Sequence, residues 1–163
     1  MVTIREVKSN EKELINEIVT IHLNTFTGFF LTFMGRGFLK QMYQSYCDYD
    51  ESGLLVAEED GKALGFLAFS SNFSGLYKFM IKTRLIQFGW YSIGAFFRRP
   101  SAFMHIISAF LKPGEAKREE KYVELSSIGV DPNVKSKGIG SKLIDALKDN
   151  VDFDKYAYIN LET

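Results

Sequence analysis

Two glycines, Gly138 and Gly140, stand between a β-prone run and an amphipathic run, and this order limits the fold strongly. The run from Tyr122 to Val130 predicts a strand, and the run from Lys137 to Asn150 predicts a helix. A helix that begins directly after glycines presents unpaired backbone N–H groups and the positive end of its dipole. Glycine also lets a phosphate approach the main chain. We therefore predict a strand–turn–helix unit that binds an anion such as a pyrophosphate.

Two common phosphate-binding motifs do not match this turn. The pattern G-x-x-x-x-G-K-[ST] of ATP-binding loops is absent from the chain. The dinucleotide fingerprint G-x-G-x-x-G would need a glycine where Leu143 stands. The loop from Asp131 to Lys137 is also too long for a turn that should leave its strand at once. Neither ATP nor NAD is the expected ligand.

Composition and charge exclude several classes of function. A chain of 163 residues with 46% hydrophobic content predicts a single domain, 1–163, with a real core. Twenty basic residues balance twenty acidic ones, so we expect no nucleic-acid partner. Cys47 is the single cysteine, and no cluster of His, Cys and carboxylates has ligand spacing, so we expect no metal site. The lone thiol and the lack of a signal peptide or membrane span predict a cytoplasmic location.

Local patterns predict the remaining elements. Residues 2–7 predict a strand, Asn10 and Glu13 resemble a capping box that starts a helix, and residues 38–46 predict a second helix. The dipeptide Asp60-Gly61 between two apolar runs predicts a tight hairpin. A helical, hydrophobic insertion at about 72–112 precedes the strand at 122–130, and a final strand is predicted at 156–161. This order indicates an α+β fold: a mixed, mostly antiparallel sheet with helices on both faces.

The segment "ELSSIGVDPNVKSKGIGSKLI", Glu124 to Ile144, resembles the acetyl-coenzyme A motif of the GNAT superfamily of N-acetyltransferases. That motif has a strand ending in an apolar-x-Val step, a turn often containing Asp-Pro, and then [Q/R]-x-x-G-x-[G/A] at the start of a helix. Lys135 departs from it, because lysine keeps a positive charge but lacks the arginine fork. The upstream order of a strand, two helices and a hairpin also matches. The resemblance implies a GNAT-like acyltransferase fold and acetyl-CoA as cosubstrate.

The resemblance also implies a division of labour around the glycine turn. The amides from Lys137 through Ser141 would hold the pyrophosphate, and the strand edge around Ile128 to Val130 would pair with the pantetheine arm. Gly129 fits either a bulge that opens the sheet for the cofactor or a bulky neighbour across the sheet. The predicted cofactor-binding residues are Ile128, Gly129, Val130, Lys135, Ser136, Lys137, Gly138, Ile139, Gly140, Ser141 and Lys142.

For catalysis, the resemblance implies attack of a neutral amine on the thioester. Glu124 occupies the position of a general base in related enzymes, although an idle strand glutamate explains it nearly as well. The backbone N–H of Val130 would be the oxyanion donor. The family's usual proton donor is a tyrosine on a helix after the last predicted strand, where the 163 residues end. We therefore expect a C-terminally incomplete fold, and an acyl-CoA-binding or regulatory module with little catalysis is the alternative function.

The acceptor is expected to be a primary amine of a small molecule or amino sugar. Phe26, Phe29 and Phe30 would line its site, although simple core filling is the favoured explanation of these side chains. The insertion at 72–112 has three interpretations: a lid over the acceptor, a homodimer face, or a basic element at a membrane surface. The edge of the final strand is a second candidate for homodimer contact. His22 is expected to be a core histidine.

Overall fold

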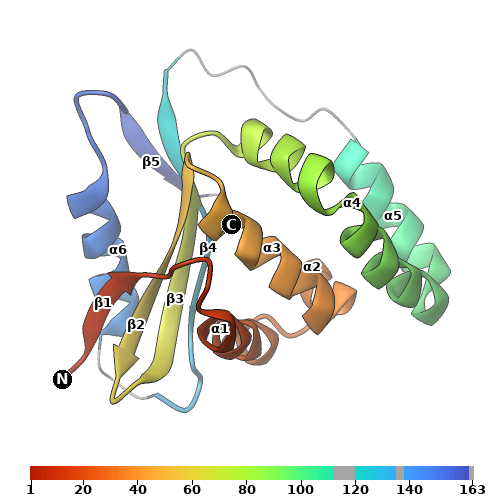
Figure 1. Ribbon diagram of the computed structural model, residues 1–163, viewed down its shortest axis with the longest axis horizontal. Helices are drawn as coiled ribbons and strands as arrows, with labels where there is room; N and C mark the ends of the chain where they lie inside the picture. Colours follow the sequence, from red (N-terminus) through yellow and green to blue (C-terminus); the bar gives the residue numbers. More distant parts are fainter. Residues whose placement is uncertain (112–119, 135–137, 162–163) are drawn as a thin grey trace.

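The computed structural model describes residues 1–111, 120–134 and 138–161. Its centre is a five-stranded sheet in the order β1-β2-β3-β4-β5 (Figure 1). Only the last pair, β4 with β5, is parallel, so the predicted mixed and mostly antiparallel sheet is confirmed. The strands are β1 (Thr3–Glu6), β2 (Ser52–Glu59), β3 (Lys62–Ser70), β4 (Tyr122–Val130) and β5 (Tyr158–Leu161).

Helices cover both faces of this sheet (Figure 1). One face carries α1 (Lys12–Thr25), α2 (Phe30–Met34) and α3 (Arg36–Asp48), and the other carries α6 (Ile139–Asn150). The apolar side chains form two clusters, one under α1 and α3 and one under α6. The insertion forms α4 (Phe73–Arg98) and α5 (Pro100–Leu111), which lie outside the layer of α2 and α3.

The hairpin between β2 and β3 forms as the sequence predicts. Asp60 and Gly61 both have positive φ, 53° and 75°, as a two-residue turn with right-handed strand twist requires. Apolar runs on either side supply the two buried strands, and β3 lies between β2 and β4. The hairpin therefore fixes the strand against which the site strand β4 pairs.

Three local features differ from the sequence predictions or were not anticipated by them. The helix expected from Asn10 begins at Lys12 without a side-chain cap, because Glu11 instead accepts hydrogen bonds from Arg5 and from the Lys8 N–H. The short helix α2 was not predicted, and α3 begins before and ends after the expected residues 38–46. The two-helix insertion is present, but α4 is kinked at Arg84, which has non-helical φ and ψ.

Candidate functional site

The described residues of β5 pair with the first half of β4 only. Its parallel pairing with β5 runs from Tyr122 opposite Tyr158 to Leu125 opposite Leu161. Among the described residues, no strand pairs with that edge of β4 beyond Leu125, whereas β3 continues along the other edge to Val130. The second half of β4 is therefore an open edge inside a mixed sheet, the kind of edge to which an extended ligand can add.

The irregularity in β4 lies at Ser126. The register with β3 shifts between Phe69 opposite Leu125 and Ala68 opposite Ser127, so Ser126 is the extra residue. The predicted bulge at Gly129 was wrong, because Gly129 pairs in register with Phe66. A Cβ on Gly129 would stand 2.7 Å from the Phe66 ring. The glycine accommodates a bulky cross-strand neighbour, and the bulge in β4 comes three residues earlier.

Two backbone amides of β4 point toward the open edge. The Asp131 N–H donates to Leu64 O at 2.8 Å, so Asp131 and Leu64 form a hydrogen-bonded pair. In an antiparallel ladder such pairs alternate with pairs that exchange no hydrogen bonds, and the next pair, Gly65 opposite Val130, is of the second kind. The N–H and C=O groups of Val130, and likewise those of Ile128, consequently face away from β3. In agreement, the Val130 carbonyl accepts a hydrogen bond from Thr25 Oγ1 at 3.1 Å. The Val130 N–H is thus directed to the edge where a ligand strand would lie.

The glycine turn leads into α6 with a left-handed residue. Gly138 has φ 61° and precedes Ile139, the first residue of α6, and the Lys142 N–H donates to Gly138 O at 3.0 Å. The amides of Ile139, Gly140 and Ser141 therefore belong to the first turn, where no intrahelical acceptor exists. The predicted contacts of Lys135, Ser136 and Lys137 lie outside the described residues.

The first turn of α6 is anchored against the sheet on its other side. Ile139 is buried, and its side chain packs over Gly65 so closely that a Cβ there would lie 2.8 Å from Ile139 Cγ2. A Cβ on Gly140 would be 4.0 Å from Val130 Cγ2, so the turn and the open edge of β4 adjoin. Lys142 is exposed. Ile139 contributes core packing, and only its amide faces the position predicted for an anion.

Glu124 lies on the side of β4 that faces α3. It is half-buried and stands in register between Ser70 of β3 and Asn160 of β5. Burial raises the pKa of Tyr46, a buried residue of α3, and the carboxylate of Glu124 raises this pKa further. Glu124 thus lies among the described paired residues of β4 and β5, one position before Leu125 opposite Leu161.

A chain of buried polar groups runs from α1 to β4. His22 Nδ1 lies 2.6 Å from the Tyr43 hydroxyl, which lies 3.4 Å from Ser127 Oγ. Burial lowers the pKa of His22 to about 4, so its ring is neutral at pH 7. His22 is only 3% exposed, as expected of a core histidine, but its pairing with Tyr43 was missed. Only the joint helical packing of α1 and α3 creates that pair.

The three predicted acceptor phenylalanines are placed differently. Phe26 is half-buried beside the open edge, with its ring 3.4 Å from where a Cβ on Gly129 would be. Phe29 is 64% exposed and meets Phe26 edge to face, with 5.7 Å between ring centroids. Phe30 begins α2 and is partly buried. Phe26 thus adjoins β4 near Gly129, Phe29 packs on Phe26, and Phe30 belongs to the neighbouring helix.

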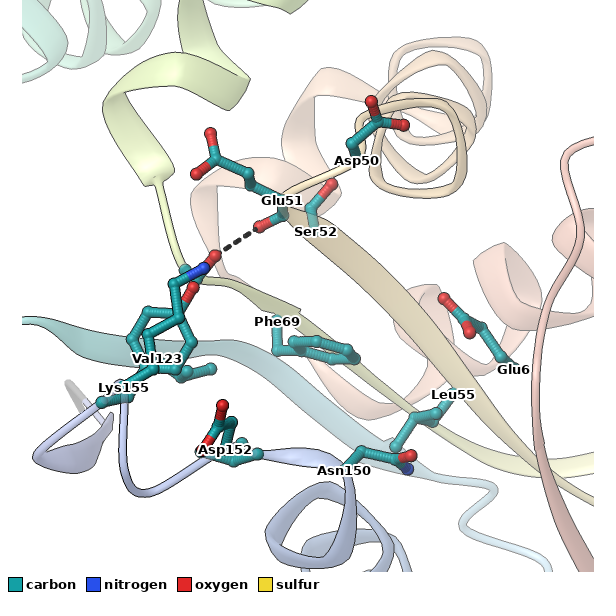
Figure 2. A pocket seen from close by; sticks show the side chains of 13 residues that line it. Glu6, Asp50, Glu51, Ser52, Leu55, Phe69, Val123, Asn150, Asp152 and Lys155 are labelled. Carbon is teal, nitrogen blue, oxygen red and sulfur yellow. Dashed lines mark hydrogen bonds between the residues drawn. The ribbon is translucent and has the colours of Figure 1, made fainter.

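A cavity of about 400 Å³ lies elsewhere, over the sheet face that carries α6 and beside the end of that helix. Figure 2 shows Phe69 at its centre, with carboxylates from Glu6, Asp50, Glu51 and Asp152 around it. No residue predicted for cofactor or acceptor binding lines this cavity. Within the described residues, no group of three or more His, Cys, Asp and Glu could hold a metal ion.

Comparison with known proteins decides the family. The model of the acetyltransferase (GNAT) family matches residues 16–152, which run from within α1 to just past the end of α6. The chain belongs to the GNAT acetyltransferase family. No curated protein matches its sequence significantly.

Solved structures of GNAT enzymes share the fold at low sequence identity. The aminoglycoside N-acetyltransferase AAC(6')-Iy, solved with CoA, aligns at a TM-score of 0.60 and 13% identity over 100% of this chain and 77% of its own. A ribosomal-protein-alanine N-acetyltransferase from Brucella melitensis aligns at a TM-score of 0.55 and 13% identity, over 100% of this chain and 80% of its own. A GNAT acetyltransferase from Staphylococcus aureus aligns at a TM-score of 0.58 and 11% identity, over 99% of this chain and 86% of its own.

The residues of this GNAT chain fit the acetyl-CoA that the family uses. Gly138 provides a left-handed turn without a side chain, and the amides of Gly140 and Ser141 are directed out of the helix start. The outward amides of Ile128 and Val130 suit an extended pantetheine arm, whose amide groups can pair as a strand does. Both sets of donors lie at one end of the sheet, since Gly140 adjoins Val130.

Proposed function

We propose that this protein transfers the acetyl group of acetyl-CoA to a primary amine of a small molecule or amino sugar. The observation that carries the proposal is the open edge of β4, with the outward Val130 N–H beside the first turn of α6. Family membership supports acetyl transfer in general. The AAC(6')-Iy enzyme, named for aminoglycosides, supports a small-molecule amine as the acceptor class.

In the proposed reaction, a neutral amine attacks the thioester carbonyl and forms a carbon–nitrogen bond. The Val130 N–H stabilises the resulting oxyanion, and Glu124, which lies six residues earlier on β4, receives through intervening water molecules the proton that the amine nitrogen loses. The carbon–sulfur bond then breaks, and the thiolate leaves with the electron pair and takes up a proton from solvent. Cys47 has no part in this direct attack, because burial raises the pKa of its thiol to about 12.

Cofactor binding is tested by removing one amide of the α6 turn. Ser141→Pro deletes an N–H that has no acceptor within the helix, so we expect the free protein to melt nearly as the wild type does. Loss of a hydrogen bond to a charged group should weaken acetyl-CoA binding by roughly 10- to 100-fold. The measurement is the melting temperature with and without acetyl-CoA, where a hundredfold excess over Kd should add about 2.7 kcal/mol to the wild type.

Ser141→Ala is the matched control, because it removes the exposed hydroxyl and keeps the amide. It should respond to acetyl-CoA as the wild type does. Equal stabilisation of the proline and alanine variants would show that the first turn of α6 does not hold the cofactor. No stabilisation of the wild type at any acetyl-CoA concentration would overturn the proposed function itself.

The general base is tested by Glu124→Gln, with Glu120→Gln as its control. Glu120 is exposed and lies just before β4, so its loss should leave activity unchanged. We expect Glu124→Gln to lower kcat by roughly 10²- to 10⁴-fold, to remove the acidic limb of the pH profile and to keep acetyl-CoA binding. Thiol release with a panel of amines is the assay. Cofactor binding by the wild type without turnover of any amine would favour the acyl-CoA-binding module instead.

A further inference from the structure

The second half of α4 has an inner side that packs on the protein. Phe88 contacts Phe38 of α3 edge to face, with 4.9 Å between centroids, and Ala95 is fully buried. Tyr91 fills the space over Gly37, where a Cβ would lie 2.2 Å from its ring. These positions share one face of the helix. They account for how α4 is attached to α3.

The opposite side of the same helix carries a continuous apolar stripe. Its members follow one another at intervals of four, three and four residues, which places them on one face and, at 100° per residue, roughly opposite Phe88 and Ala95. All are strongly exposed in the described structure: Ile86 85%, Trp90 73%, Ile93 52% and Phe97 77%. We call these four residues the α4 stripe. An apolar surface of this kind on a folded protein usually marks an interaction site.

The charges around the α4 stripe have one sign. The segment 72–111 contains Lys78, Lys82, Arg84, Arg98 and Arg99 and no aspartate or glutamate, although the whole chain has twenty acidic residues. Arg84 is neutralised by Asp48. Arg98 is exposed, but it donates to Phe33 O at 3.0 Å and so turns back toward α2. Lys78, Lys82 and Arg99 are exposed and lie before and after the stripe. A partner that covers the stripe must therefore be apolar at its centre and anionic at its rim.

We propose that the α4 stripe binds the surface of an anionic lipid bilayer, with α4 lying in the plane of the interface. Trp and Phe on one side of a helix, flanked by Lys and Arg, have the composition of interfacial helices. No helix in the described part of the chain is long and apolar enough to cross a bilayer, so the helix would lie on it. A symmetric dimer through the stripe would bring the same basic groups of two copies together, which is unfavourable.

Trp90 is the only tryptophan, so its fluorescence reports directly on the stripe. Vesicles containing phosphatidylglycerol should shift the Trp90 emission to shorter wavelength and co-sediment the protein. Vesicles of phosphatidylcholine alone should do neither, and high salt should release the protein because the attraction is electrostatic. Bromine on the lipid chains should quench the emission if the indole enters the acyl boundary. Absence of the shift, or equal binding to both vesicle types, would overturn the proposal.

Matched variants separate the stripe from general stickiness. The double variant Ile86→Ser and Phe97→Ser should abolish co-sedimentation, whereas Phe153→Ser, at an exposed phenylalanine after α6, should not. Changing both Lys78 and Lys82 to Gln should weaken binding roughly 25-fold, at about fivefold for each charge. Lys148→Gln should not weaken it. Light scattering without lipid should give a monomer, and a dimer dissolved by the serine variants without vesicle binding by the wild type would overturn the proposal.

Discussion

His22 shows how one buried side chain links α1, α3 and β4. Its ring stacks on Phe66 and meets Phe26 at a tilt. Its Nδ1 pairs with Tyr43, whose hydroxyl reaches toward Ser127. Within the described structure its Nε2 is buried without a hydrogen-bond partner. Protonation would place an uncompensated charge in that site, and burial accordingly lowers the pKa of His22 from 6.5 to about 4.

We predict that His22 makes the protein less stable in mild acid. The unfolded chain binds a proton at this ring below pH 6.5 and the folded protein does not, so stability is full above pH 6.5 and is lost as the pH falls toward 4. His22 should lower the free energy of unfolding by roughly 3 kcal/mol over this pH range. The measurement is the free energy of unfolding in urea at several pH values. His22→Asn should remove this part of the pH dependence.

The comparison needs a control because carboxylates also titrate in this range. His105→Asn changes the second of the two histidines, which is exposed, and should leave the pH dependence as in the wild type. If the wild type and His22→Asn lost stability in parallel between pH 6.5 and 4, the ring of His22 would be protonated in the folded protein. That result would contradict a neutral, desolvated histidine.

At the scale of elements, α4 is attached to α3 by an ion pair at its kink. Arg84 pairs with Asp48 and also donates to Ser45 Oγ at 3.1 Å. Burial alone would raise the pKa of Asp48, but hydrogen bonds from Ser9 and Arg84 outweigh it and lower this pKa. At pH values above the ordinary pKa of an aspartate, the pair therefore stabilises the attachment of α4. This stabilisation weakens as the pH falls below that value.

We predict that Arg84→Met destabilises the protein by roughly 1–3 kcal/mol, because Asp48 would remain partly buried without its partner. Lys82→Met also removes one positive charge from α4, but from an exposed position, and should cost less than about 0.5 kcal/mol. Denaturant unfolding at pH 7 measures both. Equal effects of the two substitutions would show that the pair does not hold α4 on α3.

Elements with strong local signals were predictable from the sequence. The Asp60-Gly61 turn, the apolar strands on either side and the helix after Gly138 follow from φ preferences and hydrophobic periodicity. The bulge at Ser126, the kink at Arg84 and the pairing of His22 with Tyr43 were not predictable. Each of these depends on which distant residue meets it, such as Asp48 for Arg84. Likewise, the role of Gly129 was decided by Phe66 across the sheet and not by its own strand.

At the scale of the whole molecule, the two proposed binding regions lie on opposite sides. The sheet and helices α1 to α3 separate α6 from α4 and α5 (Figure 1). The α4 stripe faces away from α3, and the open edge of β4 adjoins the start of α6. A protein resting on a bilayer through the stripe would thus keep the β4 edge and the α6 turn free to bind acetyl-CoA.

This separation predicts that two ligands protect different amides from hydrogen exchange. Acetyl-CoA should slow exchange at Ile128 and Val130, whose N–H groups face the open edge, and in the first turn of α6. It should leave Leu85–Arg98 unchanged, and anionic vesicles should add no protection to β4. Exchange followed by mass spectrometry with each ligand measures this. Protection by acetyl-CoA around Phe69 and Val123, which line the acidic cavity, would place the cofactor there and contradict the β4 site.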